Sequence, residues 1–260
     1  MANQLKARMA AGEAVYGLIH GLAAPTVAEM AALAGYDFVV IDGEHAPADR
    51  LTLQTLAMAI RSGGSASILR LATDDPALIG QALDLGVDGI MVPGVHDAEQ
   101  AARIAAAALY PPRGRRGNGA LVARAAGYGL ATGPYLARAN DDLLLAVMLE
   151  SRAGAEAAGR IAAVDGIDAI VVGAFDLSGD LGIPGAFEHP LFRAAMAGIE
   201  RDVAAAGKAL GSVVYPGTSV ADLLDRGHRM ITLGADTLLL ARAIEAQLAT
   251  RRPTPRRNPD

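Results

Sequence analysis

Short apolar runs of the kind that form buried strands recur along the chain, and each is separated from the next by a helical pattern. Eight such runs occur, at residues 14–19, 37–41, 67–71, 89–92, 144–149, 169–172, 209–214 and 237–240. Strands covered on both faces lose the apolar–polar alternation, so these runs predict a parallel sheet packed between helices. Eight strand–helix units favour a closed (β/α)₈ TIM barrel, an α/β fold, over an open doubly wound sheet.

The segments between these runs have the periodicity and the end signals of helices. Amphipathic patterns occupy residues 25–34, 49–61, 76–85, 98–108, 153–164, 190–206 and 220–226. No G-x-G-x-x-G pattern follows the first apolar run, which disfavours a dinucleotide-binding fold. A barrel of this type has about 250 residues, so we expect a single barrel domain with a C-terminal helix over residues 1–245. Residues 246–260 are polar and proline-rich, and we expect them to be disordered.

One connection, residues 110–142, is much longer than the others and is rich in glycine, proline and arginine. Connections of this length are usually functional or mobile. Its basic part, Arg113–Arg116, could bind a phosphate or lie in solvent. We favour the second interpretation, and the segment does not have the ending of a Walker motif.

The composition excludes several classes of protein. The net charge of −5 and the pI of about 5.5 disfavour a nucleic-acid-binding protein, which usually has a basic surface. The absence of cysteine excludes disulfides, thiolate metal sites and a cysteine nucleophile. No apolar run approaches the roughly 20 residues of a membrane span, and the N-terminal residues lack the apolar core of a signal peptide. We therefore expect a cytoplasmic protein that contacts neither membranes nor nucleic acids.

Two carboxylates stand where buried strands end. Glu150 follows the apolar run 144–149, and Asp176 comes shortly after the run 169–172. Either could instead cap a helix or pair with an arginine, because a buried carboxylate is costly without a partner. Together, on neighbouring strands, they suit a divalent cation such as Mg²⁺, which binds few protein carboxylates and keeps several waters.

A histidine follows the second predicted strand in the segment Asp42-Gly43-Glu44-His45. An imidazole in this position suits a general base, and either Asp42 or Glu44 could orient it. The alternative is a surface histidine in an ordinary loop. The remaining histidines lack comparable acidic neighbours in the sequence, and we interpret them as structural or exposed: His20, His96, His189 and His228.

Arg70 ends the third predicted strand. Its planar guanidinium could hold a carboxylate or an oxyanion, or could pair with Glu44 or Glu150. A parallel barrel brings the carboxyl ends of its strands to one rim, where the active sites of such folds lie. The sequence therefore predicts that Arg70 lies near these acidic residues and His45.

Several motifs occur in the order found in one known family. They are residues 36–47 (YDFVVIDGEHAP), 110–117 (YPPRGRRG), 124–129 (RAAGYG), 149–151 (LES), 166–168 (GID) and 176–184 (DLSGDLGIP). Together they resemble the HpcH/HpaI family of class II pyruvate aldolases, over roughly residues 13–242. This family includes 4-hydroxy-2-oxoheptanedioate aldolases and 2-keto-3-deoxy sugar acid aldolases. The resemblance implies a barrel of the phosphoenolpyruvate/pyruvate-domain type, assembled as a hexamer that is a trimer of dimers.

The resemblance also implies an activity, the cleavage of a 2-keto-3-deoxy-4-hydroxy acid to pyruvate and an aldehyde. In the family, the residues matching Glu150 and Asp176 bind a divalent metal, here Mg²⁺, Mn²⁺ or Co²⁺, that chelates pyruvate and stabilises its enolate. The arginine matching Arg70 stabilises the enolate oxygen. His45, together with Asp42, would transfer a proton by way of a water molecule.

The remaining implied contacts concern substrate binding. Backbone amides near Phe175 and Asp176 would hold the pyruvate carboxylate, and Glu44 would also contribute to the substrate site. The chain departs from the family pattern at Met148, where glutamine is common, and at Gly173-Ala174-Phe175, where Gly-Pro-Ala or Gly-Pro-Asn is common. A frequent tryptophan is replaced by Ile19-His20. These departures predict an altered choice of substrate.

Other functions remain open from the sequence. A CoA-thioester lyase or a keto-acid decarboxylase would use related enolate chemistry, and a CoA lyase would need basic residues for the nucleotide. The compact basic cluster is Arg113–Arg116, which the aldolases also have. A non-catalytic keto-acid-binding protein is the third possibility, although binding alone would not require His45 and Asp42.

Overall fold

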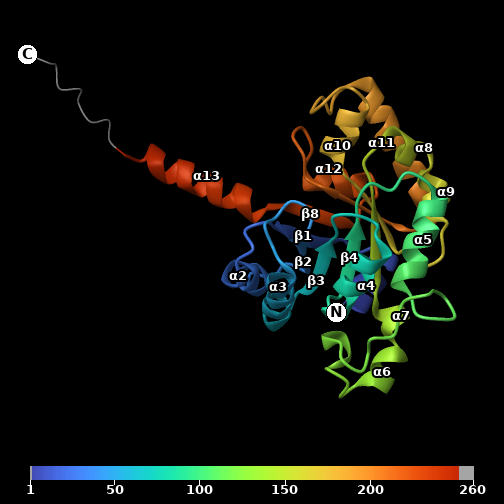
Figure 1. Ribbon diagram of the computed structural model, residues 1–260. Coiled ribbons are helices and arrows are strands. Elements are labelled where there is room, and N and C mark those ends of the chain that lie inside the picture. The colour runs from blue at the N-terminus through green and yellow to red at the C-terminus, as the bar shows by residue number, and fades with distance from the viewer. Residues whose placement is uncertain (1, 252–260) are drawn as a thin grey trace, which may run out of the picture.

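The computed structural model describes residues 2–251, and its strands form a closed parallel barrel in sequence order (Figure 1). The strands are β1 (Val15–His20), β2 (Phe38–Asp42), β3 (Ala66–Arg70), β4 (Gly89–Val92), β5 (Leu144–Leu149), β6 (Ala169–Val172), β7 (Ala209–Val213) and β8 (Met230–Ala235). β1 pairs in parallel with both β2 and β8, which closes the sheet. The predicted (β/α)₈ barrel is confirmed.

Helices surround the barrel, and several of them begin at a side chain that caps the first turn. They are α1 (Ala2–Ala10), α2 (Pro25–Leu33), α3 (Arg50–Ser62), α4 (Pro76–Asp84), α5 (Ala98–Ala108), α8 (Arg152–Glu156), α9 (Ala158–Ala162), α10 (Ala174–Asp180), α11 (Pro190–Ala205), α12 (Val220–Asp225) and α13 (Asp236–Ala249). The side chains of Asp49, Asp97 and Ser219 accept hydrogen bonds from backbone N–H groups in the first turns of α3, α5 and α12. These N–H groups have no partner within their own helix. The predicted helix 153–164 is divided at Ala157 into α8 and α9.

Alternate strand residues build two separate apolar cores. In β2, Val39 and Ile41 pack against the helices, whereas Val40 faces the barrel interior. Met91 and Met148 also belong to the interior core. Leu5 and Met9 of α1 pack into this same core, so they close the end of the barrel at which the strands begin. The barrel is therefore open at the carboxyl ends of its strands.

The eighth strand lies earlier in the chain than predicted. Residues 237–240 were expected to be a strand, but they are part of helix α13, and β8 is Met230–Ala235. A short leucine-rich run has no periodicity that separates a strand from a helix. Pairing decides the matter, because residues 230–235 complete the hydrogen bonds of both β1 and β7.

The long connection between β4 and β5 is largely ordered and lies at the end of the barrel where the strands begin. It contains η1 (Arg124–Ala126), α6 (Thr132–Leu136) and α7 (Ala139–Asp142). The Arg116 guanidinium is buried over the Tyr110 ring, 4.5 Å from its centroid, and pairs with Asp84. This part of the basic segment is therefore structural, and not a free phosphate site.

Helix α13 projects away from the barrel (Figure 1). The predicted domain boundary at residue 245 falls inside it, since α13 continues to Ala249, and residues 252–260 of the predicted tail lie outside the described residues. None of the helices between residues 2 and 251 is long and apolar enough to cross a membrane.

Gly17 in β1 provides a test of packing in the barrel interior. A Cβ atom at this position would lie 2.1 Å from Phe38 Cε2, and the Phe38 ring is fully buried. We expect Gly17→Ala to lower the free energy of unfolding in urea by about 2 kcal/mol through overpacking. The double variant with Phe38→Leu should recover much of this loss.

Gly80→Ala is the matched control, because a Cβ at this position in α4 meets no atom within 4 Å. It should raise the free energy of unfolding by about 0.5–1 kcal/mol. Equal stability of the Gly17→Ala variant and the wild type would contradict the packing described for β1.

Candidate active site

The predicted site residues lie on one rim of the barrel because their strands are parallel. Asp42 and Arg70 are the last residues of β2 and β3 and are paired in register across these strands. Glu150 directly follows β5, and Asp176 lies in the first turn of α10, after β6.

Asp42 and Arg70 form a two-point ion pair. Arg70 Nη2 lies 2.9 Å from Asp42 Oδ2, and Arg70 Nε lies 3.2 Å from Oδ1. The two side chains are only 7% and 12% exposed, respectively. Burial opposes ionisation of Asp42, but hydrogen bonds from Arg70 and from the His45 amide hold its pKa below the usual value. The pair therefore fixes the orientation of the guanidinium.

Glu44, rather than Asp42, is the carboxylate nearest to the imidazole of His45. Asp42 Oδ1 accepts hydrogen bonds from the backbone amides of Glu44 and His45, which shapes the loop. Glu44 Oε2 lies 3.4 Å from Arg70 Nη1 and 3.7 Å from His45 Nε2. The His45 side chain is 67% exposed, so it can exchange protons with water.

Glu150 is a half-buried carboxylate without an ion-pair partner among residues 2–251. Its Oε2 accepts a hydrogen bond of 2.7 Å from the Gly94 amide. Burial raises the pKa of Glu150, the Gly94 bond opposes this, and the charges of Asp176 and Glu44 raise the pKa further. Ser151, not Glu150, caps the following helix. The carboxylate is thus placed where a cation would stabilise its charged form.

The surroundings of Glu150 leave room for its carboxylate. A Cβ at Gly173 would lie 2.7 Å from Glu150 Oε1, so only glycine lets the side chain lie against the end of β6. Asp176 is exposed and does not cap α10. Among the described residues, no three acidic or histidine side chains form a metal-binding group. Two carboxylates without a third protein ligand beside them in residues 2–251 fit a divalent ion that retains several waters.

A cavity of about 650 Å³ fills the mouth of the barrel. Its wall includes Arg70, Phe175 and Asp176, and its floor includes Met91 and Met148 of the interior core. The side chains of Asp42, Glu44, His45 and Glu150 do not line this cavity. The structure therefore brings Arg70, Phe175 and Asp176 into one cavity, whereas Asp42, Glu44, His45 and Glu150 do not line it.

His20 and Asp236 form a buried pair that the sequence did not predict. His20 was expected to lack acidic company, yet its Nδ1 lies 2.7 Å from Asp236 Oδ2. Its Nε2 accepts a hydrogen bond from the Ala24 amide, so the Nδ1 nitrogen holds the proton. The two residues are 216 positions apart in the sequence, and the pairing of β1 with β8 brings them together.

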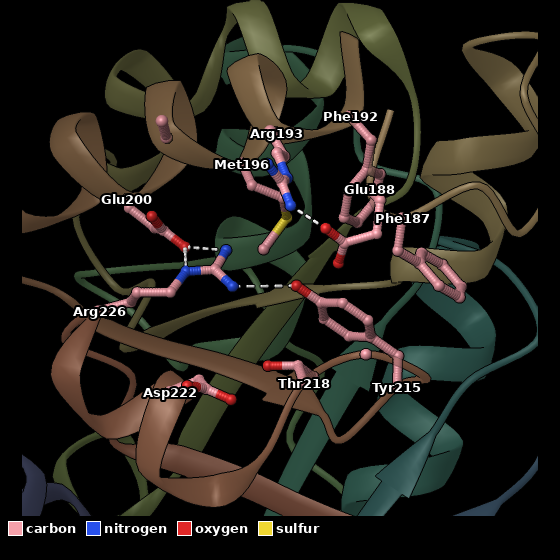
Figure 2. A pocket seen from close by; sticks show the side chains of 12 residues that line it. Phe187, Glu188, Phe192, Arg193, Met196, Glu200, Tyr215, Thr218, Asp222 and Arg226 are labelled. Atoms are coloured by element: carbon pink, nitrogen blue, oxygen red, sulfur yellow. Dashed lines mark hydrogen bonds and ion pairs between the residues drawn. The ribbon is translucent and has the colours of Figure 1, made fainter. Parts of the chain in front are cut away.

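His228 also has an acidic neighbour, contrary to expectation. Its Nε2 lies 3.3 Å from Glu200 Oε1. Glu200 in turn lines a second cavity of about 450 Å³ between α11 and α12 (Figure 2). In this cavity Glu200 accepts a hydrogen bond of 2.8 Å from Arg226 Nε, and Arg226 Nη1 donates to the Tyr215 hydroxyl. No predicted site residue lines this second cavity.

Comparison with known proteins identifies one family over nearly the whole chain. The model of the HpcH/HpaI aldolase/citrate lyase family matches residues 16–243. The chain is 39% identical to a 4-hydroxy-2-oxo-heptane-1,7-dioate aldolase of Salmonella dublin, covering 96% of this chain and 94% of the relative. It is 38% identical to a 2-keto-3-deoxy-L-rhamnonate aldolase of Klebsiella pneumoniae, covering 96% and 93%.

Solved structures agree with this assignment. A crystal structure of a HpcH/HpaI aldolase/citrate lyase family protein from Burkholderia cenocepacia superposes with a TM-score of 0.90 at 34% identity. The match covers 95% of this chain and 98% of the other.

The Asp42–Arg70 pair should stabilise the fold in a pH-dependent way. Asp42→Asn removes the two-point partner of a buried guanidinium and leaves, among the described residues, only Glu44 beside it, so we expect a loss of about 3 kcal/mol in free energy of unfolding at pH 7. Because the folded pKa of Asp42 is depressed, the contribution is complete above the unfolded pKa of about 3.9 and is lost as the pH falls through the folded pKa.

Denaturant titrations of the wild type and Asp42→Asn from pH 7 to pH 3 check this expectation. Glu13→Gln is the control, since its pair with Arg8 is exposed, and it should cost less than about 1 kcal/mol. A stability difference between wild type and Asp42→Asn that stays constant on acidification would contradict the described role of the pair.

Proposed function

Because the chain belongs to the HpcH/HpaI aldolase/citrate lyase family and is an aldehyde-lyase, we propose that it reversibly cleaves a 2-keto-3-deoxy-4-hydroxy acid. The products are pyruvate and an aldehyde. The observation that carries this proposal is the half-buried carboxylate of Glu150 near Asp176, with Arg70 held beside them by Asp42.

Glu150 and Asp176 would hold a divalent cation, Mg²⁺, Mn²⁺ or Co²⁺. When bound, such an ion supplies positive charge that polarises a keto group and stabilises negative charge on its oxygen. The raised pKa of Glu150 and the space at Gly173 support this assignment.

Arg70 would stabilise the developing enolate of pyruvate. Its Nε and Nη2 groups are bound by Asp42, so the guanidinium cannot swing away when the substrate enters. Met91 and Met148 make the inner end of the cavity apolar. A preorganised cation is more effective in such surroundings than in bulk water.

His45 and the amides of α10 would complete the site. His45 would move a proton to or from the substrate through water, with Glu44 orienting its Nε2. The first amides of α10, at Phe175 and Asp176, precede the helix's own hydrogen-bonding pattern and would donate to the pyruvate carboxylate.

We also propose that the chain assembles as a hexamer built from three dimers. The projecting helix α13 supports this, because Leu240, Ile244 and Leu248 are exposed at intervals of four residues and form one apolar stripe. Such a stripe on a protruding helix is stable in water when a second subunit covers it.

A CoA-thioester lyase is less well supported. Arg113 pairs with Asp141 and Asp165, and Arg116 is buried against Tyr110 at the opposite end of the barrel. These arginines are therefore remote from the mouth and are engaged within the chain.

Metal removal tests the proposed mechanism. We expect chelation to abolish hydrogen–deuterium exchange at C3 of pyruvate, and added Mg²⁺, Mn²⁺ or Co²⁺ to restore it. Glu150→Gln should lower the exchange rate at least about a hundredfold, because the cation would lose a charged ligand. Glu156→Gln, an exposed glutamate on the adjacent helix α8, is the control and should change the rate less than about twofold. Undiminished exchange in excess chelator would rule out the metal-dependent mechanism.

The role of His45 is tested by His45→Ala. Loss of a general base should slow C3 exchange by about a hundredfold with little change in the KM for the keto acid. Added imidazole should restore part of the rate, and His189→Ala, an exposed histidine outside the site, should behave as the wild type. An exchange rate unaffected by His45→Ala would remove this residue from the proton path.

A further inference from the structure

The wall of the mouth cavity that faces away from β2 and β3 is apolar, and we propose that it selects the substrate. On the basis of the proposed function, the preferred substrates are 4-hydroxy-2-oxo acids that carry an alkyl or aryl group at C4, and not a polyhydroxylated chain. In the cleavage, the C4 hydroxyl loses its proton and C4 becomes the aldehyde carbonyl. The electrons of the C3–C4 bond pass to the pyruvate enolate, which is then protonated at C3.

The apolar wall comes from three consecutive parts of the barrel. Tyr215 and Pro216 follow β7, Leu233 lies in β8, and Leu238 and Leu239 lie in the first turn of α13. Leu233, Leu238 and Leu239 are among the exposed large apolar side chains. An aldehyde with an apolar body would remove these apolar surfaces from water, which is favourable. A polyol would bury little apolar surface of its own against them.

Tyr215 lines the mouth cavity, but its hydroxyl is already bound outside it. The hydroxyl accepts a hydrogen bond of 3.0 Å from Arg226 Nη1 in the second cavity, and Glu200 in turn holds Arg226 (Figure 2). The ring also packs against Phe187, with 4.9 Å between centroids. The polar end of Tyr215 is therefore not available to a substrate hydroxyl in the mouth.

Few polar side chains remain on this side of the cavity. Among the described residues that line it, Thr218, Thr232 and Arg242 are the polar ones besides Arg70, Asp176 and Tyr215. A sugar-acid chain carries a hydroxyl on nearly every carbon, and each one buried without a partner lowers affinity. The wall thus favours an apolar group over a polyol.

The two apolar faces of α13 are distinct. Leu238, Leu239 and Arg242 point into the mouth cavity. Leu240, Ile244 and Leu248 do not line it, and at 100° per residue they lie on another face of the helix. The cavity wall is therefore separate from the stripe that we assign to subunit contacts.

Condensation of pyruvate with different aldehydes tests the proposal on the full-length enzyme. We expect kcat/KM to rise from butanal to hexanal by about fourfold per added methylene, the factor that corresponds to about 0.8 kcal/mol of burial. Hexanal and benzaldehyde should exceed glyceraldehyde by about tenfold or more. Equal or greater kcat/KM with glyceraldehyde would overturn the proposal.

Two neighbouring leucines provide matched variants. Leu239 and Leu240 are 50% and 48% exposed on the same helix, but only Leu239 lines the cavity. Leu239→Ser should lower the ratio of kcat/KM for hexanal to kcat/KM for glyceraldehyde by about tenfold. Leu240→Ser should leave the ratio between the two aldehydes as in the wild type. Equal effects of both substitutions on this ratio would overturn the assignment of the wall.

Hydrogen–deuterium exchange of pyruvate without aldehyde separates this inference from the proposed function. Normal exchange together with a preference for glyceraldehyde would overturn the apolar-substrate inference alone. Absence of exchange in the wild type with divalent ion present would overturn the proposed function, and this inference with it.

Discussion

The ion pair between Asp42 and Arg70 is the interaction on which the rest of the site depends. It joins the ends of two neighbouring strands and fixes a guanidinium that offsets the charges of Glu44 and Glu150. With Asp42 already taking two of its nitrogens, Arg70 cannot neutralise the remaining carboxylates completely. The half-buried carboxylate of Glu150 and the exposed one of Asp176 are left with a surplus of negative charge, which is the electrostatic argument for the cation that we propose at this rim.

The cavity then divides into a polar half and an apolar half. Arg70 and Asp176 form one side, and Tyr215 with the leucines of β8 and α13 forms the other. The hydrogen bonds among Glu200, Arg226 and Tyr215 hold the tyrosine hydroxyl away from the mouth. If the proposed apolar selection holds, these residues influence substrate choice without contacting the substrate.

Much of the fold and site follows from local sequence. Apolar runs that end in a charged residue predicted the positions of β2, β5 and β6 to within about a residue. Because the strands of the barrel are parallel, their carboxyl ends lie at one rim. Contacts that depend on tertiary packing were not predictable. The leucine-rich start of α13 resembles a strand in isolation, and the His20–Asp236 pair exists only because β1 and β8 close the barrel. Likewise, the loop places Glu44 nearer than Asp42 to the His45 imidazole.

Binding of Mn²⁺, measured through the loss of its free electron paramagnetic resonance signal, tests most directly whether the rim carboxylates form a cation site. We expect the wild-type chain to bind one Mn²⁺ with saturation, and pyruvate to alter the spectrum of the bound ion. The double variant Glu150→Gln, Asp176→Asn should show no saturable binding. Stoichiometric binding by the double variant, or none by the wild type, would contradict the assignment of Glu150 and Asp176.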